Sequence, residues 1–337
     1  MRYSSLGKVP RKRHVQVRRN GDGSPLLVEE VMGYEGFSGN ESILLHLQSP
    51  CRLGDVGGFR PIEREEWVPD AHVHRLADAN QVEPGGDPLS GRRLLMWNGD
   101  IEVSVCKPTQ ALDRFYRNGE GDEVLYIHRG SGVLRTVFGR VPFRERDYVV
   151  IPRGTTHTFE LPEDEEQFWV CFHTPGEIET PNRYRNRYGQ LLEHAPFSHR
   201  DFHPPGELVT HRENGDFELT VRVRDGFQRY LLDYHPFDVV GWDGYVYPYT
   251  FNTADFEPVT GRIHQPPPVH QTFQGQNFVI CSFCPRELDY DPQAIALPYH
   301  HSNVQSEEAI YYVEGQFGSR KGVDIGMITL HPSGLPH

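Results

Sequence analysis

Short runs in which apolar and polar residues alternate recur along most of the chain. Alternation with a period of two places every second side chain on one face of a β-strand, so each run predicts a strand with one buried face. The runs lie at residues 37–47, 94–105, 123–127, 132–138, 147–151, 167–172, 217–224, 278–283, 309–313 and 326–330. Long amphipathic helical windows are scarce, and 33 Gly and 27 Pro residues punctuate the chain. The pattern therefore predicts an all-β sandwich or barrel.

The chain also contains an internal repeat. Residues 121–130 match residues 306–315, and each segment has a Glu followed by six residues and a Gly. Downstream, residues 152–157 and 332–337 share the pattern Pro-x-Gly-x-x-His at a comparable distance. A fixed pair of elements that occurs twice predicts two copies of one barrel.

The two copies differ in the side chains that they offer to a metal ion. The three aligned positions hold His301, Glu308 and His337 in the second copy, and Tyr116, Glu123 and His157 in the first. Two imidazoles and one carboxylate on one face of an octahedral ion leave three adjacent positions open, which is the ligand set of non-haem Fe(II) oxygenases. We therefore predict a metal site in the second copy. In the first copy, the tyrosine favours a structural role.

Composition narrows the class of protein further. A chain of 337 residues usually forms more than one hydrophobic core, which agrees with a duplicated barrel. The formal net charge of −13, without a long Lys/Arg tract, argues against nucleic acid or an anionic membrane surface as a partner. No stretch reaches the roughly 20 apolar residues of a membrane span, and the N-terminus lacks the apolar core of a signal peptide. We expect a cytoplasmic protein with a small-molecule partner.

The repeat and the composition suggest a domain division. Residues 177–205 are rich in Pro, Arg, Tyr and His and show no clear alternation, which is typical of a connector. We predict an N-terminal β-rich extension and a first, non-metal barrel in residues 1–175, a connector in residues 176–236, and a second, iron-binding barrel in residues 237–337.

The repeated elements resemble the two motifs of the cupin superfamily. The C-terminal third shows a more specific likeness: residues 298–303 (Pro-Tyr-His-His-Ser-Asn), 306–308 (Ser-Glu-Glu) and 330–337 are similar to the iron-site region of the homogentisate 1,2-dioxygenase family. Residues 238–249 resemble the segment that precedes the active site in that family. The resemblance implies a bicupin, in which two double-stranded β-helices form the cupin barrels.

The resemblance also implies an activity. We expect an Fe(II)-dependent, ring-cleaving dioxygenase that acts on homogentisate or a related dihydroxylated aromatic acid and incorporates both atoms of O2. For homogentisate the product would be 4-maleylacetoacetate, a step of tyrosine and phenylalanine degradation. The family implies a homo-oligomer, a trimer or a hexamer. The alternative is a metal-dependent bicupin isomerase or a non-enzymatic bicupin binding protein, since a fold does not fix a function.

Further site residues follow from the same resemblance. His264 occupies the place of the family's acid/base histidine, and a histidine can take a proton near neutral pH. His331, Tyr299 and His270 are the candidates for contacts with the substrate. The family's spacing, taken literally, selects Glu307 as the carboxylate ligand, whereas the internal repeat selects Glu308, which we prefer. Because the family continues beyond the last histidine, we expect additional C-terminal residues to tighten iron binding at His337.

Overall fold

Almost all regular structure in this chain is β-strand. The computed structural model describes residues 2–18, 21, 23, 26–295, 299–315, 317 and 321–337. In these ranges the helices are short 3-10 turns, and none is long and apolar enough to cross a membrane. The all-β prediction is therefore confirmed.

The elements are distributed along the whole chain. The strands of the first half are β1 (Ser4–Gly7), β2 (Val28–Glu35), β3 (Ser38–His46), β4 (Asp55–Pro61), β5 (Arg75–Asp78), β6 (Arg92–Trp97), β7 (Glu102–Cys106), β8 (Phe115–Asn118), β9 (Asp122–Arg129), β10 (Gly132–Thr136), β11 (Gly139–Phe143), β12 (Asp147–Ile151), β13 (Thr156–Glu160) and β14 (Phe168–Thr174). Those of the second half are β15 (Phe202–His203), β16 (Asn214–Val223), β17 (Gly226–Tyr234), β18 (Val239–Gly244), β19 (Tyr249–Asn252), β20 (Gln271–Gly275), β21 (Phe278–Cys281), β22 (Glu308–Tyr311) and β23 (Met327–His331). The 3-10 helices are η1 (Ala79–Gln81), η2 (Asn182–Tyr184), η3 (His199–Asp201), η4 (Thr253–Asp255) and η5 (Pro267–His270).

Two seven-stranded sheets lie in the region of the predicted first barrel. One has the order β11-β10-β13-β8-β16-β17-β4, and the other has the order β15-β19-β12-β9-β14-β7-β6. Their inner faces share one apolar cluster, to which Leu134 and Phe159 contribute from the first sheet and Leu125 and Trp169 from the second. All four side chains are almost fully buried. Burial of each such side chain stabilises the fold by roughly 1.5–3 kcal/mol, so this cluster holds the two sheets face to face.

The predicted run at residues 94–105 is two strands rather than one. β6 ends at Trp97 and β7 begins at Glu102, and the intervening residues form a turn. The side-chain oxygen of Asn98 accepts hydrogen bonds from the backbone N–H groups of Asp100 and Ile101. An asparagine that bonds to the backbone two and three residues onward reverses the chain, which the alternation alone could not reveal.

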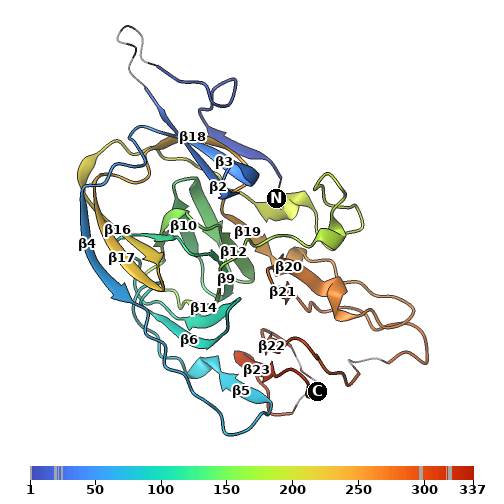
Figure 1. Ribbon diagram of the computed structural model, residues 1–337. Helices are drawn as coiled ribbons and strands as arrows, with labels where there is room; N and C mark the ends of the chain where they lie inside the picture. The colour runs from blue at the N-terminus through green and yellow to red at the C-terminus, as the bar shows by residue number, and fades with distance from the viewer. Residues whose placement is uncertain are drawn as a thin grey trace.

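Strands from distant parts of the chain share sheets. β5, near the N-terminus, pairs with β23, near the C-terminus, in the sheet β22-β23-β5, and Figure 1 shows the light-blue β5 beside the red β23. Conversely, β19 pairs with β12 of the first barrel. β16 and β17, which lie in the predicted connector, extend a sheet of that barrel. The division into domains at residues 175 and 236 stays a prediction.

The internal repeat corresponds to a repeated strand pair. In the first copy, Glu123 of β9 stands opposite Ile151 of β12. In the second copy, Glu308 of β22 stands opposite His331 of β23. The sequence match pairs these positions in the same way, so both copies adopt one register. Residue 331 therefore faces the carboxylate of the second copy, where the first copy has an isoleucine.

The next pair of positions matches as well. His157 of β13 stands opposite Tyr116 of β8 in the first copy. In the second copy, the backbones of His301 and His337 exchange two hydrogen bonds, at 3.2 and 2.9 Å. The fold thus sets the aligned positions Tyr116 and His301 at equivalent places, and it brings His301 next to His337 although the two are far apart in sequence.

The glycines of the repeat have matching backbone conformations. Gly130 and Gly315, which end the Glu-x6-Gly elements, have φ angles of 100° and 99°. Gly154 and Gly334, inside the Pro-x-Gly-x-x-His elements, have φ angles of 85° and 81°. Because other residues rarely adopt positive φ, these turns need glycine, and the motif spacing encodes them.

One buried ion pair in the N-terminal sheet β1-β18-β3-β2 should make stability depend on pH. Burial alone would lower the pKa of His46, but hydrogen bonds to Asp238 (2.7 Å) and Glu30 (2.9 Å) raise it to about 9. Because the pKa of His46 is higher in the folded state than its unfolded value of about 6.5, protonation of His46 stabilises the fold. This stabilisation is complete below about pH 6.5 and is lost as the pH rises through about 9.

We therefore expect the free energy of unfolding to fall by about 3 kcal/mol from this group between pH 6.5 and pH 10. The change should disappear in His46→Gln and persist in His194→Gln, which alters an exposed histidine. Urea unfolding of the three proteins across this pH range measures the effect. A His46→Gln profile parallel to that of the unmodified chain would contradict it.

Candidate metal centre

The structure brings together the three predicted donors of the second copy. His301 lies before β22, Glu308 is its first residue, and His337 follows β23. One side-chain nitrogen or oxygen of each residue lies within 4.8 Å of the others. Two imidazoles and one carboxylate at this separation can converge on a single divalent cation.

The hydrogen bonds behind the two imidazoles fit metal ligation. His301 Nδ1 lies 3.3 Å from the Tyr299 carbonyl oxygen, and His337 Nδ1 lies 3.2 Å from the Leu335 carbonyl oxygen. A carbonyl only accepts, so each Nδ1 carries the proton and each Nε2 keeps a lone pair. Ligating histidines in metalloproteins usually donate their other N–H in this way.

The remaining nitrogen of His337 supports the same conclusion. His337 Nε2 is buried and has no hydrogen-bond partner in the part of the chain that the structure describes. It nevertheless lies 3.0 Å from Glu308 Oε2. With Nδ1 protonated in a neutral ring, two lone pairs face each other at this distance, an arrangement that a cation between them would stabilise. The donor set therefore fits a metal ion.

The neighbouring glutamates differ in position. Glu308 is partly buried, and its Oε2 accepts a hydrogen bond from His331 Nδ1 at 2.9 Å. Glu307 is exposed and lies outside the donor group. Successive side chains of a strand point to opposite faces, so only one of the two can reach the histidines. The geometry favours Glu308, as the internal repeat predicts.

The other predicted site residues lie at different distances from this group. His331 is buried, and its hydrogen bond orients the Glu308 carboxylate. It therefore supports a predicted ligand, whereas the sequence predicts a contact with the substrate. Tyr299 is half exposed and packs edge-on against the His264 ring, with 5.2 Å between the ring centroids. Its carbonyl meets His301. Tyr299 thus connects His264 to the donor group, although no direct contact between His264 and the donors is seen in the described residues.

His264 and His270 have contrasting surroundings. His264 Nδ1 lies 3.8 Å from Oδ2 of the buried Asp289. His270 is packed between the aromatic rings of Phe256 and Phe283, and burial lowers its pKa to about 4. A neutral, enclosed imidazole of this kind is typical of a packed core position, and the structure does not bring His270 to the donor group.

Two histidines that sequence reasoning missed also reach this region. His72 and His74 precede β5, and their Nε2 atoms lie 2.9 Å from the Ser333 carbonyl oxygen and 3.2 Å from the Pro336 carbonyl oxygen. Histidines at alternate positions of an extended segment share one face, and this His-x-His pattern was the available signal.

In the first copy of the repeat, an arginine pairs with the aligned carboxylate. Arg92 contacts Glu123 Oε2 at 2.7 Å, while Tyr116 and Asn118 donate to Glu123 Oε1 at 2.8 and 2.9 Å. Burial alone would raise the pKa of Glu123, but the Arg92 guanidinium holds it well below its ordinary value. The cation that this carboxylate requires is thus supplied by the chain itself, which agrees with the structural role predicted for Glu123 and His157.

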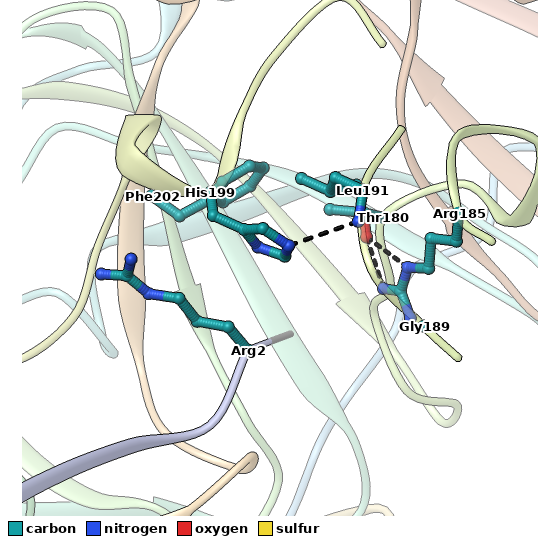
Figure 2. Close-up of a pocket in the computed structure, with 7 residues that line it drawn as sticks. All are labelled: Arg2, Thr180, Arg185, Gly189, Leu191, His199 and Phe202. Carbon is teal, nitrogen blue, oxygen red and sulfur yellow. Dashed lines mark hydrogen bonds between the residues drawn. The ribbon is translucent and has the colours of Figure 1, made fainter. Parts of the chain in front are cut away.

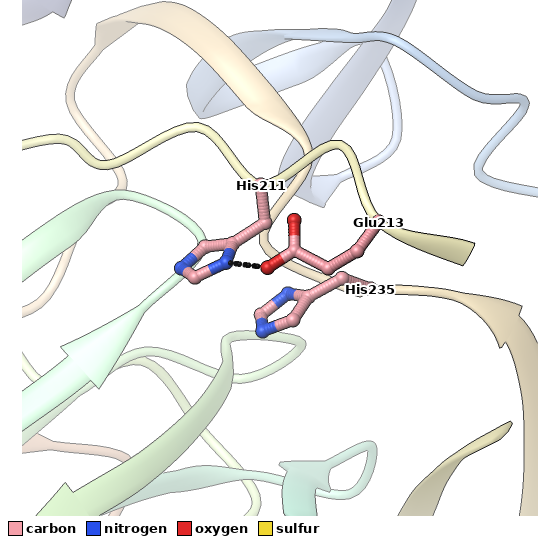
Figure 3. Close-up of side chains that lie close together, drawn as sticks. All are labelled: His211, Glu213 and His235. Atoms are coloured by element: carbon pink, nitrogen blue, oxygen red, sulfur yellow. Dashed lines mark hydrogen bonds and ion pairs between the residues drawn. The ribbon is translucent and has the colours of Figure 1, made fainter. Parts of the chain in front are cut away.

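A second group of potential donors, His211, Glu213 and His235, is shown in Figure 3. Its hydrogen bonds run in the wrong direction for a metal site. His235 Nδ1 accepts from the backbone N–H of Phe237 at 3.0 Å, so its proton is on Nε2. The His211 and His235 rings are also stacked in parallel, 3.7 Å apart, so their in-plane lone pairs do not converge. This cluster resembles a metal site only in composition.

A small cavity lies beside the N-terminus, and Figure 2 shows the residues around it. Its volume is about 10 Å³, which is room for one water molecule. Arg2 and Arg185 give it a positive character, but Arg185 already bonds to Thr180, and His199 Nε2 accepts a hydrogen bond from the Leu191 backbone. The cavity is too small for an organic substrate.

The fold is all-β, and the second copy of the repeat carries a complete candidate metal centre. Residues 97–253 match the family model described as "Homogentisate 1,2-dioxygenase N-terminal". A protein of Saccharolobus solfataricus named "Putative dioxygenase SSO1533" is 40% identical over 336 residues, which cover 99% of this chain and 86% of that protein. The chain belongs to the homogentisate 1,2-dioxygenase family of dioxygenases.

More distant proteins are also similar. The homogentisate 1,2-dioxygenase of Bradyrhizobium diazoefficiens is 27% identical over 306 residues, covering 86% of this chain and 64% of that protein. The chain thus spans less than two thirds of that relative. Among solved structures, a cupin-2 domain containing protein from Shewanella frigidimarina is 17% identical and covers 25% of this chain and 78% of its own, with a TM-score of 0.23. A TM-score this low does not establish a shared fold. The fold assignment of this chain rests on its own sheets and on its family membership.

Proposed function

We propose that this chain is an Fe(II)-dependent ring-cleaving dioxygenase that acts on homogentisate or a related dihydroxylated aromatic acid. The observation that carries the proposal is the group of His301, Glu308 and His337, with both histidines donating Nδ1–H to backbone carbonyls. When bound, Fe(II) would supply three adjacent positions for the substrate oxygens and O2. The name of the Bradyrhizobium relative and the sequence resemblance support the choice of substrate.

The chain's own residues divide the remaining tasks. His331 holds the Glu308 carboxylate in place through its Nδ1–H. His264 Nδ1 faces Asp289 Oδ2 at 3.8 Å, so Nε2 is the nitrogen left to accept a proton from a substrate hydroxyl. Tyr299, whose ring contacts that of His264, is the proposed hydrogen-bond donor to the carboxylate of the substrate. A cytoplasmic location and a homo-oligomeric assembly belong to the same proposal and rest on the sequence.

Oxygen uptake tests the proposal. The chain, loaded anaerobically with Fe(II), should consume O2 when homogentisate is added and should stop when a ferrous chelator is added. A metal-dependent isomerase or a binding protein would consume none. Absence of uptake with homogentisate and with every other dihydroxylated aromatic acid would contradict the proposed activity.

A further prediction concerns the proton acceptor. His264→Gln should lower kcat by about 100-fold, because the glutamine cannot take a proton, while the affinity for Fe(II) should stay unchanged. Steady-state oxygen uptake and a separate metal titration measure the two quantities. The exposed neighbour Ile263 provides a control as Ile263→Val. A loss of metal affinity in His264→Gln would assign the residue to metal binding instead.

A further inference from the structure

An N-terminal segment lies against the C-terminal tail that carries His337. This strap, residues 72–78, contains β5, which pairs antiparallel with β23 so that Arg75 stands opposite Leu330 and Asp78 opposite Met327. Figure 1 shows the strap beside the C-terminus. The register, continued by one residue, sets His74 opposite His331. The strap thus meets the metal centre from a part of the chain that contributes none of its three donors.

Two imidazoles of the strap bind the backbone of the tail, residues 333–337. His72 Nε2 lies 2.9 Å from the Ser333 carbonyl oxygen, and His74 Nε2 lies 3.2 Å from the Pro336 carbonyl oxygen. Each ring must donate, because a carbonyl only accepts. The backbone of the tail is also hydrogen-bonded to residues 301–303, so the bonds from the strap anchor it on a second side.

His74 also contacts the rings of the centre. Its centroid lies 5.5 Å from that of His331 and 6.0 Å from that of His337, at interplanar angles of 81° and 77°. Edge-to-face contacts of this kind favour one orientation of each ring. His337 is therefore held at its Nδ1 by Leu335, at its backbone by His301 and at its ring by His74.

We infer that His74 is a positioning residue of the metal centre, which orders the tail and orients His337 without ligating the metal. The inference rests on the proposed metal binding by the triad. Ligand groups that are ordered before binding lose less conformational entropy when the metal binds, and loss of an outer hydrogen bond of this kind lowers metal affinity by about 10- to 100-fold. The N-terminal strap and the metal are consequently coupled.

Titration with Co(II) as the probe tests the inference. His74→Ala should bind Co(II) about 10- to 100-fold more weakly than the unmodified chain, and His74→Gln should recover part of the loss, because its amide can donate to Pro336. His194→Ala, which removes an exposed histidine outside the strap, should bind normally. At saturation the visible spectrum of His74→Ala should equal that of the unmodified chain. A changed spectrum would make His74 a ligand and overturn the positioning role.

A second measurement needs no variant. Because coupling is reciprocal, Co(II) should slow amide hydrogen exchange in residues 72–78 of the unmodified chain, although none of them ligates the metal. Unchanged exchange there, or equal Co(II) affinity in His74→Ala and the unmodified chain, would overturn the inference while the metal site stands. Failure of the unmodified chain to bind Co(II) would instead overturn the metal site itself.

Discussion

Glu308→Gln is expected to lower the affinity for Fe(II) by more than about 100-fold and to abolish oxygen uptake, since it removes the only carboxylate of the donor group. The glutamine keeps the size of the side chain and can still accept from His331, so the fold should be retained. Metal titration followed by an oxygen-electrode assay measures both effects.

The adjacent Glu307→Gln provides a matched control. It makes the same chemical change one residue away, on an exposed side chain. Metal affinity and activity should stay within about 2-fold of the unmodified chain, because substitutions at exposed positions usually change free energies by only about 0.5 kcal/mol. The reverse outcome, with Glu307→Gln inactive and Glu308→Gln active, would show that the literal family spacing selects the ligand and that the repeat does not.

Arg92→Met should lower the free energy of unfolding by about 3–5 kcal/mol, the usual cost of leaving one partner of a buried ion pair without its counter-charge. Glu123 is fully buried, and Arg92 is the cation bound to its Oε2. Neutralising the carboxylate as well, in Arg92→Met/Glu123→Gln, should recover most of the loss, because Tyr116 and Asn118 can still donate to the amide oxygen.

Chemical denaturation of the single and double variants measures this coupling. The control is Arg93→Met, which removes the next, exposed arginine and should change stability by no more than about 0.5 kcal/mol. Metal binding in the second copy should survive in every one of these variants. Additive effects of the Arg92 and Glu123 substitutions would contradict the view that the arginine replaces a metal in the first barrel.

The residues that sequence predicts well are those whose geometry is encoded locally. Positive φ angles at Gly130 and Gly315 and the Pro-x-Gly-x-x-His turns fix the register of the strand pairs, so the repeat alone places Glu308 and His337 at matching positions. The spacing therefore carries three-dimensional information, and it selects Glu308 over its neighbour Glu307 as the predicted ligand.

The features that sequence misses depend on pairing between distant segments. β5 has only four residues, too few for alternation to be seen, and its partner β23 lies near the other end of the chain. The His-x-His pattern at His72 and His74 therefore signals a shared face but does not say which site that face meets. The role of Arg92 is missed for the same reason, because it follows from the contact with Glu123 and not from any sequence pattern around Arg92. Conversely, the composition of His211, Glu213 and His235 suggests a metal site that their hydrogen bonds do not support.

Isotope incorporation tests the central claim most directly. The chain, loaded with one equivalent of Fe(II) and mixed with homogentisate under 18O2, should yield an acyclic product that carries two 18O atoms, with allowance for exchange with water, and Glu308→Gln should yield none. A product without 18O, or equal 18O incorporation by Glu308→Gln, would contradict dioxygen chemistry at His301, Glu308 and His337.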